Sequence, residues 1–269
     1  MILQERTEKK VDINLPAGEG ENQILYLAAS VGKILIESGA ETYRVEEIIK
    51  KITSNFGLES SPFAIPTCIM CSARNKKGEI FSLIERVSSR TTDLDKVNKI
   101  NNLVRHIEEY SYDGFKTELE KIKKGEYYSE MQKLVAYFGG AAFFSVLFKG
   151  GLPEFFASGI AGIFLFFWIK FANFLNMNQY FNLVVGGSVC SMVAYTLSKF
   201  GLIAEVPITI ISSYMIMVPG ISFTNAIRDL IAGDFVSGLS RGAEAILIGA
   251  TLAVGSGFTI YILIEFGGV

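Results

Sequence analysis

The chain divides into a charged first half and an apolar second half. Of its 52 charged residues, 41 fall within residues 1–133, which leaves 11 for the remaining 136 positions. Such a long apolar stretch would aggregate in a soluble domain, whereas a bilayer core about 30 Å thick requires helices of about 20 apolar residues. The second half therefore predicts an integral membrane domain, and the first half predicts a soluble domain attached to it.

Five apolar runs predict about five transmembrane helices in the second half. They cover residues 132–147, 152–169, 180–198, 202–221 and 243–264. The first two runs are short for a full span, which favours a tilted or re-entrant segment for one of them. The predicted fold class is thus mixed: a small α+β domain is followed by an all-α membrane domain. The predicted boundaries are 1–22 for a flexible amino terminus, 23–130 for the α+β domain and 131–269 for the membrane domain.

Apolar residues in the first half recur at helical spacing in three places and alternate with strand-like runs in between. The helical stripes cover 24–35, 45–56 and 94–107, and a last helix is expected at about 114–124. Gly39 ends the first helix, and Ser38 and Glu41 stand at capping-box spacing before the second. Residues 62–72 and 79–87, joined by a polar segment, predict a β-hairpin.

Several function classes are excluded by composition. Residues 1–133 carry 20 positive and 21 negative charges, so a nucleic-acid partner is not expected. Cys68 and Cys71 have the spacing of half a zinc site, but no second cysteine pair or nearby histidine completes it. On a strand they point to opposite faces, which favours packing. We therefore expect neither a metal nor a cofactor.

Enzymatic signatures are also missing from the sequence. His106 is the only histidine and falls off the stripe of its helix, and the chain has neither a nucleophile elbow nor a phosphate-binding loop. The chain is therefore not expected to be an enzyme. Without a phosphate-binding loop, any transport across the membrane would be coupled to an ion gradient rather than to nucleotide hydrolysis by this chain. A membrane-anchored hydrolase that uses the cytosolic carboxylates is the alternative from a different class.

The charge distribution predicts a multi-pass protein of the cell membrane. Residues 1–22 are polar and lack a secretory signal, so the amino-terminal domain is expected in the cytoplasm. Basic residues flank the predicted cytosolic ends of the spans, as the positive-inside rule requires. They are Lys116, Lys121, Lys123, Lys124, Lys133, Arg228 and Arg241.

Two polar groups are candidates for a site. The first lies at the start of the second helix, where Glu41 and Arg44 share a face and can form a hydrogen-bonding surface. The alternative is a helix start whose carboxylates complement the helix dipole. The second group is a charged island between the last two apolar runs, which carries Asn225, Arg228, Asp229, Asp234, Arg241 and Glu244.

The charged island suits a transport pathway, because charge next to a span is costly unless it is used. Arg228 or Arg241 can bind a substrate carboxylate, and Asp229 or Asp234 can bind an ammonium group or carry a coupled proton. The alternative is a cytosolic loop whose charges only fix the topology. Pro219 and Gly220 break the preceding helix, either to line a cavity or as a plain helix stop.

Several short motifs in the two halves of the chain occur in the same order as in a known protein family. The run 38–46 (SGAETYRVE) is followed by Pro66-Thr67, Arg86-Val87 and Arg90, and the second half adds 218–220, Asn225, Arg228-Asp229, Gly233-Asp234, Gly238, Arg241 and Glu244-Ala245. The chain resembles the amino-terminal component of the bacterial threonine/serine exporter family over about residues 24–257.

The resemblance implies export of small hydrophilic metabolites, which are threonine and serine in some members and dicarboxylates in others. It also implies a two-part exporter: the sequence ends at Val269 without a second module, so a smaller membrane subunit is expected as the partner in an oligomeric complex within the lipid bilayer. A regulatory scaffold for that subunit is a further alternative. The motif residues implied for the cytosolic part are Ser38, Gly39, Glu41, Thr42, Arg44, Glu46, Pro66 and Thr67.

Overall fold

The computed structural model describes residues 19–125 and 128–266. They form two compact units: the first contains residues 1–126 and 221–242, and the second contains residues 127–220 and 243–269. Residues 221–242, which the sequence analysis grouped with the membrane domain, thus pack within the first unit. Residues 1–18 of the predicted amino-terminal segment lie outside the described residues, and residues 19–22 belong to the first helix.

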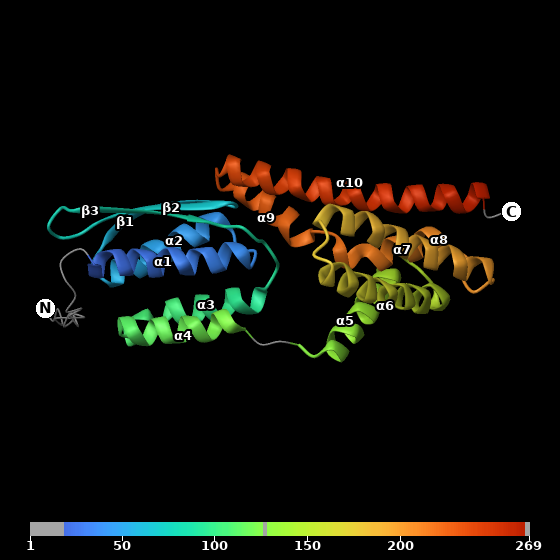
Figure 1. Ribbon diagram of the computed structural model, residues 1–269, viewed down its shortest axis with the longest axis horizontal. Helices are drawn as coiled ribbons and strands as arrows, with labels where there is room; N and C mark the ends of the chain where they lie inside the picture. The colour runs from blue at the N-terminus through green and yellow to red at the C-terminus, as the bar shows by residue number, and fades with distance from the viewer. Residues whose placement is uncertain (1–18, 126–127, 267–269) are drawn as a thin grey trace, which may run out of the picture. The chain divides into compact units, whose positions relative to one another are not determined.

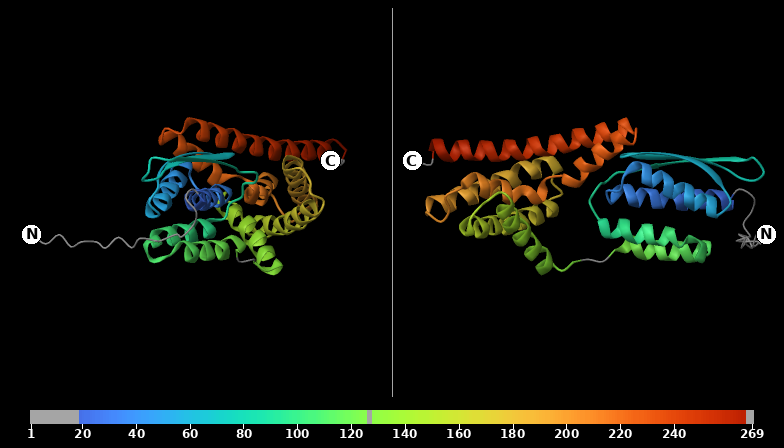
Figure 2. Two further views of the ribbon diagram at one scale, coloured as in Figure 1. Left: turned by 60° about the vertical axis from the view of Figure 1, so that its left-hand side comes forward. Right: turned by 180° about the vertical axis from the view of Figure 1, so that it is seen from behind.

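The first unit is built in three layers, a sheet and two pairs of helices (Figure 1, Figure 2). Helices α1 (Glu19–Glu37) and α2 (Thr42–Asn55) lie against the sheet. Helices α3 (Leu94–Arg105) and α4 (Tyr112–Lys124) form the layer beyond them, joined by the 3-10 turn η1 (Ile107–Glu109). The middle layer is the core, because side chains from all three layers meet there without exposure to solvent. Examples are Val31, Ile49, Ile69, Ile100 and Phe115.

The sheet has three antiparallel strands in the order β1-β2-β3, where two were predicted. They are β1 (Glu59–Ile65), β2 (Cys68–Arg74) and β3 (Ile80–Arg86). The run predicted as one strand over 62–72 turns at Pro66 and Thr67, so Ile65 pairs with Cys68. Along β2, Ile69, Cys71 and Ala73 face the core, and burial raises the pKa of the Cys71 thiol to about 11. Cys68 and Cys71 therefore point to opposite faces, as the sequence predicts.

Helix ends in the first unit follow local chemistry. The Asp93 carboxylate caps α3 by accepting from the Lys96 amide at 3.0 Å, and Ser111 caps α4. The capping box predicted for α2 is wrong, because the N-cap is Glu41 and its side chain makes no capping bond. Ser38 instead belongs to the end of α1, where its carbonyl accepts from the Asp93 amide at 3.0 Å.

The described residues of the second unit form helices joined by short loops and turns, with no strand. It contains α5 (Glu130–Leu147), α6 (Leu152–Phe174), α7 (Gln179–Lys199), α8 (Val206–Tyr214) and the 3-10 turn η2 (Met215–Met217). Most of α10 (Phe235–Phe266) also belongs to it. Small residues permit close helix packing, as at Gly187, where an added Cβ would lie 2.6 Å from the Leu252 carbonyl oxygen.

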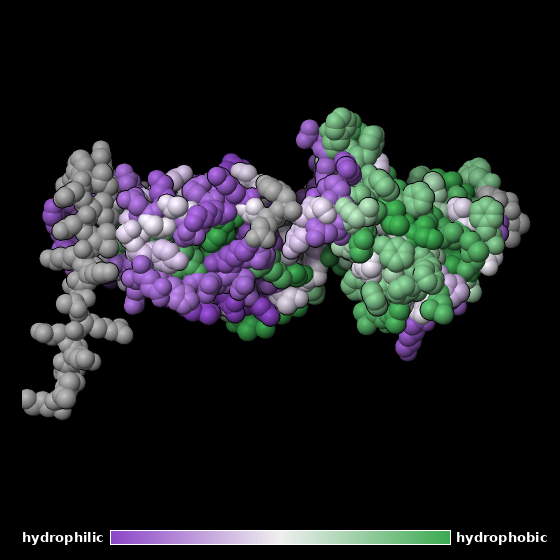
Figure 3. Space-filling model, turned by 90° about the horizontal axis from the view of Figure 1, so that it is seen from below, coloured by the Kyte–Doolittle hydropathy of each residue, from purple (hydrophilic) through white to green (hydrophobic). Residues whose placement is uncertain are grey.

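Three helices of the described residues, α6, α7 and α10, are long and apolar enough to cross a membrane. A fourth crossing is obtained if α8 with η2 and the helix α9 (Gly220–Ile231) count as one span, although they are bent by 65°. The predicted count of five is therefore not reached: α5 begins with polar residues, and the run over 202–221 breaks near Pro219. Hydrophilic residues gather over the first unit and hydrophobic residues over the second (Figure 3).

Candidate functional site

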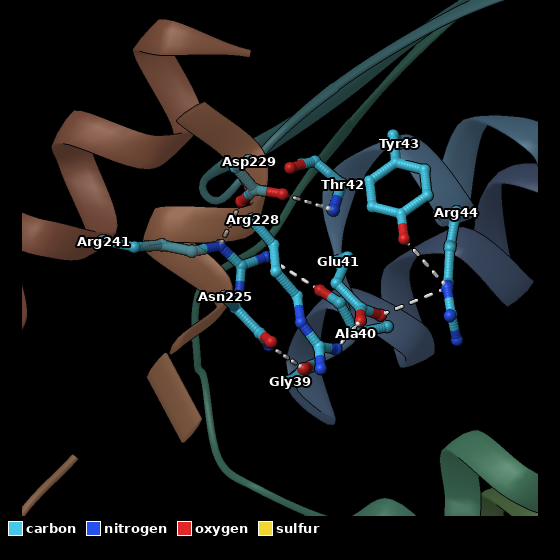
Figure 4. A network of polar contacts seen from close by, with 10 residues as sticks. All are labelled: Gly39, Ala40, Glu41, Thr42, Tyr43, Arg44, Asn225, Arg228, Asp229 and Arg241. Carbon is cyan, nitrogen blue, oxygen red and sulfur yellow. Dashed lines mark hydrogen bonds and ion pairs between the residues drawn. The ribbon is translucent and has the colours of Figure 1, made fainter. Parts of the chain in front are cut away.

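Two segments far apart in the sequence meet within the first unit. The turn after α1 contributes Gly39, Ala40, Glu41 and Thr42, and the hairpin of α9 with the start of α10 contributes Asn225, Arg228, Asp229 and Arg241 (Figure 4). We refer to these eight residues as the clasp. The clasp joins the cytosolic motif predicted from the sequence to the predicted charged island.

The turn after α1 is a Schellman motif. The Gly39 amide donates to the Ile36 carbonyl at 3.1 Å, and the Ala40 amide donates to the Leu35 carbonyl at 2.9 Å. Gly39 has a φ of +89°, which favours glycine, and a Cβ there would lie 3.3 Å from the Thr91 carbonyl oxygen. The motif leaves the carbonyls of Gly39 and Ala40 available to side chains from elsewhere.

The hairpin between α9 and α10 also turns through a Schellman motif. At the end of α9 the Gly233 amide donates to the Leu230 carbonyl at 3.1 Å, and the Asp234 amide donates to the Asp229 carbonyl at 2.8 Å. Gly233 has a φ of +94°, a conformation that favours glycine and ends the helix. The chain then reverses, and a Cβ at Gly238 would lie 2.8 Å from the Ala226 carbonyl oxygen. This close approach returns Arg241 to the side of Asp229.

Five contacts hold the clasp together, and three of them involve backbone atoms of the turn. Asn225 Nδ2 donates to the Gly39 carbonyl at 2.8 Å, and Arg241 Nη2 donates to the Ala40 carbonyl at 2.8 Å. The Thr42 amide donates to Asp229 Oδ1 at 3.4 Å. Two ion pairs complete the set: Arg228 Nη1 to Glu41 Oε1 at 2.6 Å, and Arg241 Nε to Asp229 Oδ2 at 3.2 Å.

The clasp has a buried edge and a solvent-accessible edge. Asp229 is fully buried and the Arg241 side chain is 7% exposed, so their ion pair lies out of water. The Arg228 side chain is 55% exposed although its partner Glu41 is buried. Arg44, also exposed, extends this edge, since its Nε lies 3.6 Å from Glu41 Oε2 and 3.2 Å from the Tyr43 hydroxyl. A solute in the surrounding water can thus reach Arg228 and Arg44 first.

Two carboxylates near the start of α2, Glu41 at its N-cap and Glu46 in its second turn, differ in their protonation chemistry. Burial alone would raise the pKa of Glu41, but hydrogen bonds from its own backbone amide and from Arg228 outweigh burial and hold the pKa below its ordinary value. Burial raises the pKa of Glu46, and the negative charge of Asp234 raises it further, against a hydrogen bond from the Ala64 amide. Glu41 is therefore held as an anion, whereas Glu46 retains a proton more readily than an exposed glutamate.

Other predicted site residues lie outside the clasp. Asp234 is half-buried between α9 and α10, and Ser38 precedes the turn. Pro66 and Thr67 form the β1–β2 turn. Pro219, Gly220 and Glu244 belong to the second unit. Sequence reasoning did not identify the Ala40 carbonyl as a partner of Arg241, since a backbone acceptor leaves no signal in residue identity.

A further polar residue missed from the sequence is Glu154, near the start of α6 in the second unit. It is 4% exposed, and its carboxylate accepts from the amides of Gly151, Ala204 and Glu205 at 2.9, 3.2 and 3.3 Å. The signal was available, because an acidic residue inside an apolar run is expensive and needs partners. Here the three amides satisfy it and tie two helix starts together.

Comparison with known proteins decides the family. The sequence profile of the family described as "Putative threonine/serine exporter" matches residues 26–263. The chain belongs to this exporter family. The family consists of transporters rather than enzymes, so the alternative of a membrane-anchored hydrolase is set aside.

The relatives of this chain carry two kinds of name. This chain is 23% identical over 227 residues to the "Probable succinate transporter subunit YjjP" of Klebsiella aerogenes, and the alignment covers 82% of this chain and 86% of that protein. The protein of the same name from Escherichia coli is 22% identical over 249 residues, covering 88% and 93%. The "Threonine/serine exporter" of Corynebacterium glutamicum is 25% identical over 252 residues, covering 88% of this chain and 50% of that protein. No solved structure matches the chain.

Proposed function

We propose that this chain is one subunit of an exporter that moves small carboxylate-bearing metabolites out of the cytoplasm. The substrates would be amino acids of the threonine and serine type or dicarboxylates, export would be coupled to an ion gradient, and a second membrane subunit would complete the pathway. The observation that carries this proposal is the clasp, in which two arginines of α9 and α10 bind carboxylates and a carbonyl of the chain itself.

A substrate carboxylate is chemically equivalent to the groups that the two arginines now hold. Guanidinium groups bind carboxylates through paired hydrogen bonds, and Arg228 is exposed enough to exchange Glu41 for a solute. A substrate ammonium group could in turn take the place of an arginine beside Glu41 or Asp229. Substrate would therefore compete with internal partners and shift the clasp from closed to open, which makes opening depend on substrate.

The coupled ion in this proposal is a proton. The sequence nominated Asp229 or Asp234 as its carrier, and the raised pKa of Glu46 beside Asp234 adds a second carboxylate to that site. Burial and the negative charge of Asp234 both favour the protonated form of Glu46. Protonation of Glu46 would remove negative charge next to the hairpin of α9 and α10.

A separate partner subunit is supported by the names of the relatives. Two relatives that align over 86% and 93% of their length are named as subunits. The relative named "Threonine/serine exporter", whose name does not contain the word subunit, is about twice as long as the aligned region, since only 50% of it is covered. We therefore expect that transport requires a second polypeptide together with this one.

The test is an export assay in cells that lack both proteins and receive them back together. External and internal threonine, serine and succinate are measured after the cells are loaded. We expect Arg228→Gln and Asp229→Asn to abolish export when the rate is normalised to the amount of each variant in the membrane. Asp95→Asn is the matched control, because Asp95 is an exposed carboxylate of the same unit that lies outside the clasp and pairs with Lys99 in α3, at 2.8 Å.

The outcome separates transport from a regulatory role. Full export by Arg228→Gln and Asp229→Asn at normal abundance would contradict a transport role for the clasp. Export by the partner alone, at the rate of the pair, would make this chain a regulatory scaffold. A wild-type pair that exports none of the three metabolites would refute the proposed substrate class.

A further inference from the structure

A second polar site lies in the second unit, where the end of α5 meets the starts of α6 and α8. A Cβ at Gly150, in the loop between α5 and α6, would lie 3.0 Å from the Ser145 carbonyl oxygen, Glu154 Cβ and Ile208 Cγ2. The three helices therefore converge at this loop. Five hydroxyl-bearing residues are fully buried on these helices, within about a turn and a half of the three contact residues: Ser145, Ser158, Thr209, Ser212 and Ser213. We refer to them as the hydroxyl cluster.

Four members of the hydroxyl cluster donate their single proton to a carbonyl that lies three or four residues earlier in the chain. The pairs are Ser145 with Ala142 at 2.8 Å, Thr209 with Glu205 at 3.4 Å, Ser212 with Ile208 at 2.6 Å and Ser213 with Thr209 at 2.5 Å. A hydroxyl oxygen also has two lone pairs that accept hydrogen bonds. The buried oxygens of the hydroxyl cluster are therefore acceptors for a donor that comes from elsewhere.

Ser158 is the member of the hydroxyl cluster that has no partner. Its hydroxyl oxygen is buried and makes no hydrogen bond with any residue that the structure describes. A buried hydroxyl without a hydrogen bond is costly and is rare in native proteins. Ser158 follows Glu154 by one turn, so both side chains lie on the same face of α6. The unpartnered hydroxyl thus indicates a ligand beside Glu154.

Glu154 adds negative charge to this end of the second unit. Its carboxylate accepts from the three backbone amides described above, and a carboxyl group that only accepts hydrogen bonds is ionised. These amides carry no formal charge, and the nearest lysine in the sequence, Lys149, is exposed. Accepting hydroxyl oxygens beside a carboxylate favour a ligand that is positively charged and donates hydrogen bonds.

We propose that the hydroxyl cluster binds the ammonium group of the exported solute. An ammonium group carries one positive charge and three hydrogen-bond donors, which suit the accepting oxygens of the cluster and the charge of Glu154. This inference rests on the proposed export function and narrows its substrate class. An amino acid of the threonine and serine type carries an ammonium group, whereas a dicarboxylate does not.

The hydroxyl cluster is closed in this structure, because none of its side chains is exposed. A solute therefore enters when α8 moves away from α5 and α6. Helix α8 has only 9 residues, and with η2 it is followed by α9 across a bend of 65°. Discontinuous helices of this kind form substrate sites in many transporters. Since α9 carries Arg228 of the clasp, a carboxylate site and an ammonium site lie on the two halves of one bent helix pair.

The test is isothermal titration calorimetry on the purified full chain in lipid nanodiscs, at constant ionic strength and at a pH that keeps amines protonated. The titrants are threoninamide, which keeps the ammonium group and lacks the carboxylate, N-acetylthreonine, which keeps only the carboxylate, and sodium chloride. We expect threoninamide to bind and the other two not to bind.

Two substitutions remove hydroxyl groups from the cluster. Ser158→Ala and Thr209→Val should each weaken threoninamide binding by at least about tenfold, because each removes a hydrogen bond to a charged group. Ser158→Ala should not lower the melting temperature without ligand, since its hydroxyl makes no hydrogen bond that the fold can lose. Thr196→Val is the matched control: its hydroxyl also donates to a carbonyl of its own helix, that of Met192 at 2.7 Å, but the residue is exposed.

Each outcome bears on the proposal. Loss of threoninamide binding in Ser158→Ala, at an unchanged melting temperature and with Thr196→Val unaffected, supports it. Binding of N-acetylthreonine alone overturns it, and binding of sodium alone assigns the cluster to an inorganic cation. Binding of none of the three also overturns it and leaves Ser158 to an ordered water molecule.

Two comparisons locate the ammonium group and separate this proposal from the export function. Undiminished binding in both Ser158→Ala and Thr209→Val overturns the assignment to the hydroxyl cluster, and loss of binding in Glu41→Gln instead places the ammonium group in the clasp. The titration requires neither a partner subunit nor an ion gradient. A failure of the proposed export function therefore appears in the export assay, and a failure of this site appears in the titration.

Discussion

Replacement of Asp229 by asparagine tests whether the buried ion pair holds the clasp closed. Asp229 is fully buried and Arg241 Nε lies 3.2 Å away with its side chain 7% exposed. Asparagine keeps the shape and an oxygen for the Thr42 amide, but it leaves the Arg241 charge buried without its counter-ion. Removal of one partner of a buried pair costs about 3–5 kcal/mol. Glu41→Gln should cost only about 0.5–1 kcal/mol, because the Arg228 side chain is 55% exposed and can be solvated.

Hydrogen exchange measured by mass spectrometry is the appropriate assay for this prediction. The only tryptophan, Trp168, belongs to α6 in the second unit, so intrinsic fluorescence does not report on the clasp. A loss of 3–5 kcal/mol corresponds to exchange that is faster by about a hundredfold to a few thousandfold, at 1.4 kcal/mol per tenfold. The increase is expected in peptides covering residues 36–45 and 221–242, with peptides from β2 unchanged.

A double-mutant cycle supplies the refutation. Asp229→Asn with Arg241→Met removes both charges, so the double variant should recover about 2 kcal/mol relative to the sum of the single changes. The lost hydrogen bond to the Ala40 carbonyl still costs about 1 kcal/mol. The reasoning fails if Asp229→Asn accelerates exchange less than tenfold, or if the two single effects simply add.

Three further predictions concern pH, helix packing and Glu154. The folded chain holds the pKa of Glu41 below its ordinary value of 4.5. The ion pair of Glu41 with Arg228 therefore stabilises the clasp above pH 4.5, and this stabilisation is lost as the pH falls through the folded pKa. Hydrogen exchange at residues 36–45, corrected for intrinsic rates, should rise at acid pH more in the wild type than in Glu41→Gln. Gly255→Ala should destabilise the second unit by about 1–3 kcal/mol, because the new Cβ collides with the Val184 carbonyl, whereas the Cβ of Gly249→Ala enters open space and should be tolerated. Thermal unfolding followed by Trp168 fluorescence compares the two variants, and equal stability would contradict this packing. Glu154→Gln should destabilise the same unit by about 1–3 kcal/mol, since the buried side chain loses one of the acceptor oxygens that serve three amides. An unchanged melting temperature would show that these bonds contribute little.

Periodicity predicted the elements of the first unit well where a single stripe was buried. Val45, Ile49 and Ile52, predicted as one face of a helix, are all fully buried in α2. The sheet was predicted with one strand too few, because residues 62–72 are almost continuously apolar and the turn at Pro66 and Thr67 interrupts backbone pairing without interrupting hydropathy. Chain reversal inside an apolar run depends on long-range pairing that a local pattern does not contain.

The candidate site could be predicted in part. The charged island and the motif at residues 38–46 were both singled out from the sequence, and Asn225 and Asp229 of the island are buried on the face of α9 that meets the turn after α1. That they meet this turn was not predictable from charge alone, since three of the five contacts use main-chain groups of residues 39, 40 and 42. The predicted count of five exceeds the three or four spans that the described helices offer, because hydropathy alone did not reveal the 65° bend in the fourth run and because α5 begins with polar residues.

The reliance of the clasp on main-chain atoms has a consequence for how its sequence can drift. The carbonyls of Gly39 and Ala40 and the amide of Thr42 are present whatever side chains these residues carry. Saturation mutagenesis of residues 39–42 should therefore find other small side chains tolerated at Ala40, which is 4% exposed, and almost no replacement tolerated at Gly39, whose φ of +89° and proximity to the Thr91 carbonyl require glycine. Recognition of this kind can persist through extensive divergence while leaving little trace in the identity of the recognised residues.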